Sequence, residues 1–248
     1  MQFKNYFSKQ ADVYARSRPR YPASLAAVLT GLVERRVLAW DVATGNGQLA
    51  VGLAEHFEAV IATDASARQI ASATAHPRVR YAVSLAEDSK LPPASADLIT
   101  VAQAVHWFDL ERFYAEVRRV AAPGAVLVLV GYGPFLLDSF PAAVRGALEA
   151  YMAAVEMFWP PERQLIDSEY RTVDFPFAEI PLTLAPLEER WTNERMLGYL
   201  RSWSATQRYI EAKGPDSLLA LAEELADAWG ESLYNVRWPL FLRAGRID

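Results

Sequence analysis

The 248-residue sequence contains no cysteine. This absence excludes disulfide bonds, thiolate–zinc sites and a cysteine nucleophile together. It agrees with a reducing compartment, and the polar, charged residues 1–19 contain no apolar core of a signal peptide. The sequence therefore predicts a cytoplasmic protein.

The sequence also lacks a long apolar run of the kind that spans a membrane. The longest uncharged stretch, residues 120–137, contains two prolines and three glycines, which would break a spanning helix. A buried strand with a loop on each side is the better explanation, and no membrane partner is expected.

Basic residues are too few and too scattered for a nucleic-acid partner. Lysine and arginine number 25 against 30 acidic residues, the net charge is −5 and the isoelectric point is about 5.4. Pairs such as Arg118-Arg119 are typical of solvated helix faces rather than of a phosphate-binding track. Histidine is scarce too, and His56 and His76 have no partner at metal-ligand spacing, so no metal is expected.

The first half of the chain has the pattern of a globular α/β protein. Hydrophobic residues make up 52% and charged residues 22% of the chain, as in folded enzymes. Strands are expected at 37–42, 59–63, 79–83, 97–102 and 125–130, and helices at 25–34, 48–56, 66–75 and 110–120. This alternation predicts a doubly wound α/β fold, with a parallel sheet covered by helices on both faces.

The pattern changes after residue 131. Residues 132–181 are rich in aromatic residues and proline, and are expected to form an insertion over the sheet edge with a helix at 142–158. Two last strands are expected at 182–191 and 234–245, with helices at 193–203 and 216–229 between them.

The stretch "DVATGNGQLA", residues 41–50, predicts a nucleotide-binding loop. Gly45 and Gly47 follow a predicted strand that ends near Asp41, and glycine lets a ligand approach the backbone closely. From Gly45 the stretch matches G-x-G-x-x-A, a dinucleotide fingerprint. From Asp41 it matches the looser acidic loop that binds S-adenosylmethionine, so the glycines alone leave both nucleotides open.

Asp64 ends the second predicted strand, about 20 residues beyond the glycine loop, the usual distance for a carboxylate that binds ribose hydroxyls. The alternative is a helix N-cap for the helix that begins near Ser66. NAD and S-adenosylmethionine both carry a ribose, so Asp64 does not decide between them. Tyr209 and Lys213 fit the Tyr-x-x-x-Lys pair of some NAD-dependent reductases, but lie outside the strand–helix unit that normally carries it.

Three longer stretches favour S-adenosylmethionine over NAD, because they resemble motifs of a known family. "AWDVATGNGQLAVGLAEHF", "VIATDASARQI" and "YAVSLAEDSKLPPASADLITVAQAVHWFDLERFYAEVRRVAAPGAVLVL" resemble successive motifs of class I S-adenosylmethionine-dependent methyltransferases. The resemblance is to the type 11 group, related to ubiquinone-biosynthesis and trans-aconitate methyltransferases. "AQAVHWFD", together with "RPRYP" and "LRSWSATQRY", is similar to one subgroup, and the resemblance covers most of the chain.

The resemblance implies a mostly parallel seven-stranded sheet with an antiparallel last strand, helices on both faces and a helical cap. It implies methyl transfer from S-adenosylmethionine, leaving S-adenosylhomocysteine, by a single domain that is a monomer or weak homodimer. The implied parts are an amino-terminal lid and helix (1–35), a cofactor-binding core (36–131), a cap (132–181) and completing strands and helices (182–248). The implied cofactor-binding residues are Asp41, Ala43, Gly45, Gly47, Asp64, Ala65, Ala86, Glu87 and Gln103.

Two residues depart from the family pattern. Ala43 stands where the first loop glycine is most common, and its methyl group is tolerable if φ stays negative. Leu85 stands where many relatives have an aspartate for the adenine amino group, so Ala86 and Glu87 are expected to supply that recognition, partly through backbone atoms.

The acceptor is expected beside the fourth strand. His106 is a candidate general base or hydrogen-bond donor to an acidic substrate, and Trp107 is a candidate to face the sulfonium; ordinary packing is the alternative for both. The resemblance also implies that the amino-terminal segment folds over the pocket as a lid that contains Tyr14, Arg18 and Tyr21. An arginine of this lid is expected to lie near a carboxylate of the cofactor or of the substrate. Trp203 is a further substrate-side candidate.

The predicted function is methyl transfer to a small molecule, with a carboxylate as one candidate acceptor. Alignment and exclusion of water supply most of the catalysis in such a displacement, about 7–11 kcal/mol in favourable cases. A protein or RNA methyltransferase, an NAD(P)-dependent oxidoreductase and a cofactor-binding module without catalysis are the alternatives.

Overall fold

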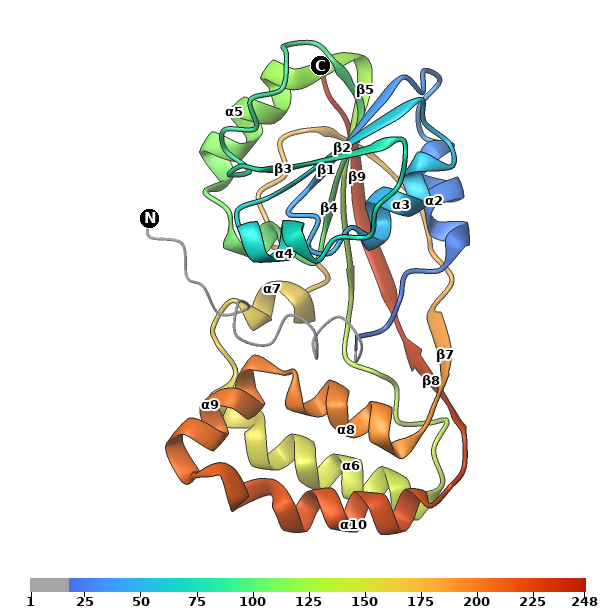
Figure 1. The fold of residues 1–248 in the computed structure, drawn as a ribbon, viewed down its shortest axis with the longest axis vertical. Coiled ribbons are helices and arrows are strands. Elements are labelled where there is room, and N and C mark those ends of the chain that lie inside the picture. Colours follow the sequence, from blue (N-terminus) through green and yellow to red (C-terminus); the bar gives the residue numbers. More distant parts are fainter. Residues whose placement is uncertain (1–17) are drawn as a thin grey trace.

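A seven-stranded sheet forms the centre of the molecule in the computed structural model, which describes residues 18–248 (Figure 1). The strands lie in the order β3-β2-β1-β4-β5-β9-β6. Their bounds are β1 Leu38–Val42, β2 Ala59–Asp64, β3 Val79–Val83, β4 Ala96–Ala102, β5 Ala121–Tyr132, β6 Ala178–Ile180 and β9 Leu240–Arg246. Strands β1 to β5 are parallel, and β9 is antiparallel to both β5 and β6. The predicted fold class is confirmed.

Helices cover both faces of the sheet because its central strands are apolar on both sides. Alternate residues of β5 divide between two cores: Val126 and Val128 pack with α2 (Ala23–Thr30) and α3 (Gln48–Ala54), and Leu127 and Leu129 pack with α5 (Leu110–Val120). This division follows from the two-residue period of a strand. The short helix α4 (Ala67–Ala71) contacts β2 and β3.

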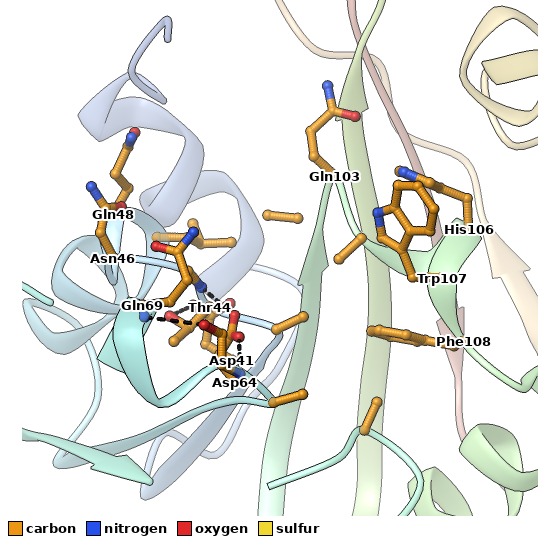
Figure 2. A pocket seen from close by; sticks show the side chains of 18 of the residues that line it. Asp41, Thr44, Asn46, Gln48, Asp64, Gln69, Gln103, His106, Trp107 and Phe108 are labelled. Atoms are coloured by element: carbon orange, nitrogen blue, oxygen red, sulfur yellow. Dashed lines mark hydrogen bonds between the residues drawn. The ribbon is translucent and has the colours of Figure 1, made fainter. Parts of the chain in front are cut away.

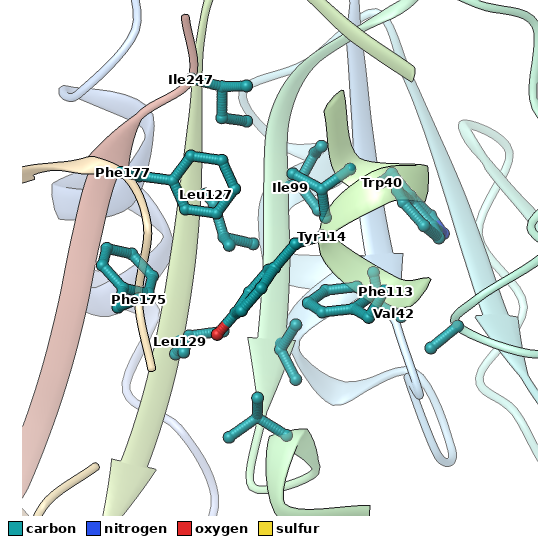
Figure 3. Packing of buried hydrophobic residues seen from close by; sticks show 14 of the residues in the cluster. Trp40, Val42, Ile99, Phe113, Tyr114, Leu127, Leu129, Phe175, Phe177 and Ile247 are labelled. Atoms are coloured by element: carbon teal, nitrogen blue, oxygen red, sulfur yellow. The ribbon is translucent and has the colours of Figure 1, made fainter. Parts of the chain in front are cut away.

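Helix α5 occupies the residues predicted for it. Asp109 caps its first turn by accepting from the Arg112 N–H at 3.4 Å, and Arg118 and Arg119 lie in its last turn, where cations oppose the helix dipole. Its apolar side places the ring of Phe113 6.5 Å from that of Trp40, in a cluster that also contains Leu129, while Phe175 and Phe177 cover the neighbouring sheet surface (Figure 3).

A second group of elements packs beyond the end of the sheet. It contains α6 (Ala142–Val155), α8 (Asn193–Arg201), α9 (Ser204–Lys213), α10 (Leu219–Trp229) and a two-stranded sheet of β7 (Leu187–Trp191) and β8 (Tyr234–Trp238) (Figure 1). Trp191 and Trp238, from the two strands, lie 4.7 Å apart between ring centroids and are fully buried. These elements, called the helical part below, have an aromatic core of their own. The small helix α7 (Arg163–Asp167) lies between the helical part and the sheet (Figure 1).

The last strands differ from the expectation. The predicted strand at 182–191 does not join the large sheet: β7 pairs only with β8, and β6 takes the edge position instead. The predicted strand at 234–245 is interrupted at Pro239, which has no N–H to donate, so β8 and β9 belong to different sheets. Helix α9 was not predicted, and the helix expected at 142–158 ends at Val155 with a 3₁₀ turn to Phe158.

Within residues 18–248, none of the helices combines the length and the apolar character needed to cross a lipid bilayer.

Candidate active site

A cavity of about 510 Å³ opens where the carboxyl ends of β1, β2 and β4 meet, the position at which open α/β sheets bind ligands. The predicted residues that line it are Arg18, Tyr21, Asp41, Ala43, Gly45, Asp64, Ala65, Ala86, Glu87, Gln103, His106 and Trp107. Figure 2 shows its two sides, with Asp41, Thr44 and Asp64 facing the side formed by Gln103, His106 and Trp107.

Two of the predicted residues that the structure describes, Gly47 and Trp203, do not line this cavity. Gly47 caps α3 with φ +85°, and a Cβ there would lie 2.2 Å from Tyr81 Oη, so close packing accounts for this glycine. Trp203 is buried in the helical part between Phe135 and Trp159, so its predicted substrate contact gains no support. Tyr14 lies outside the described residues.

The loop after β1 contains an unexpected backbone conformation. Ala43 has φ +52°, not the negative value expected for an alanine. The chain reverses sharply here, because the Thr44 N–H donates to the Thr63 carbonyl at 2.9 Å and the Gly47 N–H donates to the Thr44 carbonyl at 3.0 Å. Position 43, where the family most often has glycine, therefore has a left-handed backbone conformation. This conformation is about 1–2 kcal/mol less favourable for an alanine than a right-handed one.

Asp41 holds this loop from the end of β1. The Thr44 hydroxyl donates to its Oδ2 at 2.5 Å and the Thr100 hydroxyl donates to its Oδ1 at 2.7 Å. Burial raises the pKa of Asp41 to about 6, against the lowering effect of these hydrogen bonds. The carboxylate is nevertheless mostly ionised at pH 7 and gives the cavity a negative charge.

Asp64 joins the loop to the second strand. Its Oδ2 accepts from the Gly45 N–H at 2.9 Å and its Oδ1 accepts from the Ser66 N–H at 2.8 Å, while burial raises its pKa. Two of the roughly four acceptor sites of a carboxylate are thus used, which leaves capacity for ligand hydroxyls. The N-cap of α4 is Ser66, whose hydroxyl accepts from the Gln69 N–H at 3.4 Å, so the N-cap alternative for Asp64 is wrong.

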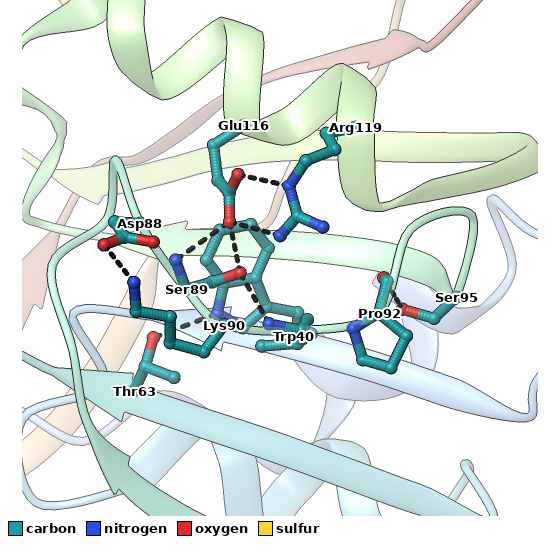
Figure 4. Close-up of polar contacts among 10 residues, drawn as sticks. Trp40, Thr63, Asp88, Ser89, Lys90, Pro92, Ser95, Glu116 and Arg119 are labelled. Carbon is teal, nitrogen blue, oxygen red and sulfur yellow. Dashed lines mark hydrogen bonds and ion pairs between the residues drawn. The ribbon is translucent and has the colours of Figure 1, made fainter.

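The loop of residues 84–91 is fixed to α5 by Glu116 (Figure 4). Glu116 Oε1 accepts from the Ser89 N–H at 2.8 Å and the Ser89 hydroxyl at 2.5 Å, and the carboxylate pairs with Arg119 at 2.7 Å. The pairing with Arg119, aided by Ser89, lowers the pKa of Glu116 to about 2. On the same loop, Glu87 Oε1 accepts from the Asp109 N–H at 2.9 Å, so this carboxylate holds the loop in place.

The opposite side of the cavity begins at the end of β4. Gln103 has φ +55°, and its Nε2 donates to the Tyr132 carbonyl at 2.9 Å. His106 Nδ1 is buried and has no hydrogen-bond partner among the described residues, and the His106 ring lies 4.7 Å from that of Trp107. Burial lowers the pKa of His106 to about 4, although the charge of Glu162 acts in the other direction, so the imidazole is neutral at pH 7.

Residues 18–21 connect the cavity to the helical part. Arg18 Nη2 donates to the Ser202 carbonyl at 3.3 Å, and its guanidinium lies 5.3 Å from the centroid of the Tyr199 ring. The Arg20 N–H donates to Glu189 Oε1 at 2.5 Å. The predicted lid residues Arg18 and Tyr21 thus line the cavity from a segment that is attached to β7 and α8.

Comparisons with known proteins agree with this geometry. Residues 40–129 match the model of the methyltransferase domain. A candidate methyltransferase of Dictyostelium discoideum is 34% identical over 247 residues, which cover 97% of this chain and 94% of that protein. The chain belongs to the class I S-adenosylmethionine-dependent methyltransferases. The solved structure of a candidate type II methyltransferase from Anaeromyxobacter dehalogenans is 46% identical with a TM-score of 0.84, covering 93% of this chain and 98% of the other. An uncharacterised methyltransferase of Mycobacterium tuberculosis is 36% identical over 125 residues, about half of each chain.

Membership of this methyltransferase family overturns the alternative of an NAD(P)-dependent oxidoreductase. Tyr209, part of the pair that suggested a reductase, packs against Phe158 in the helical part with the ring centroids 5.1 Å apart. The cavity residues fit S-adenosylmethionine instead. Asp64 has acceptor capacity left for hydroxyl groups, Asp41 is a carboxylate in the cavity lining, and a Cβ added at Gly45 would meet no atom within 4 Å.

Several residues of this methyltransferase site were not predicted. Tyr132 and Glu162 line the cavity from the end of β5 and from the turn before α7. Neither residue belongs to a local sequence motif. Contacts between segments distant in sequence bring both residues to the cavity. No group of three or more metal-ligating side chains occurs in the part of the chain that the structure describes.

Proposed function

We propose that this methyltransferase transfers the methyl group of S-adenosylmethionine to a small-molecule acceptor bound beside His106. The observation that carries the proposal is the placement of Asp41, Thr44 and Asp64 on one side of the cavity, opposite His106 and Trp107. One side suits a cationic nucleoside, and the other leaves room for a second molecule.

Different residues of the chain have different roles in the proposed reaction. Asp64 accepts the ribose hydroxyls, Asp41 attracts the amino group of the methionine moiety, and the backbone of residues 85–87 borders the adenine. The donor supplies an activated methyl group with a neutral leaving group. Trp107 and Phe108 exclude water from the space where donor and acceptor meet.

The character of the acceptor follows in part from the same cavity. A small molecule is proposed because the cavity volume of about 510 Å³ is in the range of small-ligand sites. A carboxylate acceptor is the hypothesis drawn from the sequence, with Arg18 as its partner. The cytoplasmic location, the monomeric or weakly dimeric state and the absence of a nucleic-acid partner stay predictions.

Replacement of Asp64 tests the donor site. Asp64→Ala removes two backbone hydrogen bonds of the loop and the proposed ribose contacts, each about 1.5–3 kcal/mol for a charged acceptor. We expect the affinity for S-adenosylhomocysteine, measured by titration calorimetry, to fall at least about 100-fold.

Asp216→Ala is the matched control, because Asp216 is exposed in the helical part and outside the cavity lining. Its affinity should equal that of the natural chain. Binding of neither S-adenosylmethionine nor S-adenosylhomocysteine by the natural chain would refute the proposed function.

A further inference from the structure

The side of the cavity opposite the donor residues has a distinct chemistry. It presents four aromatic rings, those of Tyr21, Trp107, Phe108 and Tyr132, beside the imidazole of His106 and the carboxylate of Glu162. We propose that the acceptor is a planar compound with a hydroxyl group, and that His106 takes the hydroxyl proton while Glu162 stabilises the imidazolium. This inference rests on the proposed function and specifies its substrate class.

The aromatic rings favour a planar acceptor. The rings of Tyr21 and Tyr132 meet edge to face, with centroids 6.2 Å apart and an interplanar angle of 64°. The ring of Trp107 approaches the cavity from the turn after β4 (Figure 2). Flat aromatic walls bind planar molecules through stacking and edge contacts, with little loss of side-chain entropy.

The charges of the lining disfavour an anionic acceptor. The carboxylates of the described lining are Asp41, Asp64, Glu87, Asp109 and Glu162, against the arginines Arg18 and Arg112. The Arg18 guanidinium is directed to the Ser202 carbonyl and the Tyr199 ring. Within the described lining, a bound carboxylate would thus meet more acidic than basic side chains, which raises its free energy.

His106 is suited to a hydroxyl group rather than an amine. Because Nδ1 is buried, Nε2 is the ring nitrogen that can reach the cavity. The imidazole is a weak base, since burial lowers its pKa to about 4. A hydroxyl oxygen becomes a protonated ether as it attacks, and this species is acidic enough to give its proton to a weak base. A neutral amine attacks through its lone pair without losing a proton, so a base such as His106 is expected to contribute less to its methylation.

The proposed reaction is a displacement at the methyl carbon in which one bond forms as another breaks. A lone pair of the hydroxyl oxygen forms the new bond to the methyl carbon, and the carbon–sulfur bond of the donor breaks with its electron pair passing to sulfur. The hydroxyl proton passes to Nε2 of His106. The charge of Glu162, which lines the same cavity, stabilises the resulting imidazolium, and the proton then leaves to solvent. Glu162 is a positioning residue in this scheme, acting through His106.

Three compounds with one ring system test the substrate class. The protein is assayed with S-adenosylmethionine and 2-naphthol, 2-naphthylamine or 2-naphthoate, and their binding to the protein loaded with S-adenosylhomocysteine is followed by tryptophan fluorescence. We expect binding and methylation of 2-naphthol, with turnover at least about 10-fold above that of the other two. Equal or faster methylation of the amine or the carboxylate, or no methylation of the naphthol by a protein that binds the donor, overturns the inference. Failure to bind the donor overturns the proposed function instead.

Matched variants test the two residues. His106→Gln should lower kcat for 2-naphthol about 100-fold or more and Glu162→Gln about 10-fold, with KM and donor affinity nearly unchanged. The exposed residues His56 and Glu156 supply the controls His56→Gln and Glu156→Gln, which should leave all three quantities unchanged. An unchanged kcat in His106→Gln, or a loss that appears only in KM or donor affinity, would contradict the proposed base.

Discussion

Single residues that follow β1 and β4 depart from their usual conformations where ligand contact is proposed. Ala43 and Gln103 both have left-handed φ values, +52° and +55°, and both line the cavity. Such positions are unfavourable for residues with a Cβ and persist where surrounding contacts enforce them. Here the enforcing contacts are backbone hydrogen bonds to β2 and β5.

The strain at Ala43 predicts a stabilising substitution. Ala43→Gly relieves about 1–2 kcal/mol of left-handed strain and loses about 0.4–1 kcal/mol through the more flexible unfolded chain. We expect the free energy of unfolding in urea to rise by up to about 1.6 kcal/mol, with donor affinity retained.

Ala94 is a companion site, because it also has a left-handed φ, +49°, but lies outside the cavity lining. Ala94→Gly should stabilise the protein similarly. A decrease in stability for Ala43→Gly would show that the methyl group contributes more packing energy than the backbone strain costs.

At the scale of elements, hydrogen bonds between loops and helices position the site. The loop of residues 84–91 has no strand or helix of its own, and its Ser89 is held by Glu116 of α5. The residues of this loop are contiguous with a family motif, but Glu116 lies 27 residues away from Ser89. The sequence predicted the loop and helix α5, whereas the bond between them required the packed structure.

Glu116→Gln tests this contact and its pH dependence. Arg119 and Ser89 lower the folded-state pKa of Glu116 to about 2, so the contribution to stability is present above the ordinary pKa near 4.5 and is lost as pH falls toward 2. We expect the variant to be about 2–3 kcal/mol less stable at pH 7 in urea unfolding, at about 1.4 kcal/mol per pKa unit. The difference should shrink progressively between pH 4.5 and pH 2.

Glu111→Gln is the control on the same helix, because Glu111 is exposed in the first turn of α5. Its effect should stay within about 0.5 kcal/mol. A stability difference for Glu116→Gln that does not change with pH would contradict the role of its charge.

At the scale of the whole molecule, residues 18–21 join the helical part to the cavity. Glu189 of β7 accepts from the Arg20 N–H at 2.5 Å and from Trp191 Nε1 at 2.9 Å, and it pairs with Arg195 of α8 at 2.5 Å. The same segment places Arg18 and Tyr21 in the cavity. Packing of the helical part is thereby connected to the side of the cavity where we propose that the acceptor binds.

Glu189→Gln should therefore affect the acceptor more than the donor. Loss of the charge weakens the attachment of residues 18–21, and we expect KM for the acceptor to rise about 3- to 10-fold while the affinity for S-adenosylhomocysteine stays within 2-fold, about 0.4 kcal/mol. Steady-state kinetics and calorimetry give the two values.

Glu188→Gln is the matched control, since the adjacent residue of a strand points to the opposite face and Glu188 is exposed. An equal loss of donor affinity in Glu189→Gln would refute a role confined to the acceptor side.

The sequence by itself determined the parallel core and the donor side of the site. Strands β1 to β4, the loop from Asp41 to Gly47 and Asp64 are consecutive in the chain, and a parallel sheet brings the ends of its strands to one edge. Local apolar patterns and residue spacing were therefore sufficient for these parts.

Only the tertiary structure decided the side of the cavity opposite Asp41 and Asp64, and the edge of the sheet. Tyr132 and Glu162 reach the cavity from segments without a local signal, and β7 pairs with β8 through residues about 47 positions apart. The left-handed φ of Ala43 depends on the bond from Thr44 to Thr63. Each of these features arises from contacts between residues distant in sequence, and patterns read along the chain do not encode which distant partners meet.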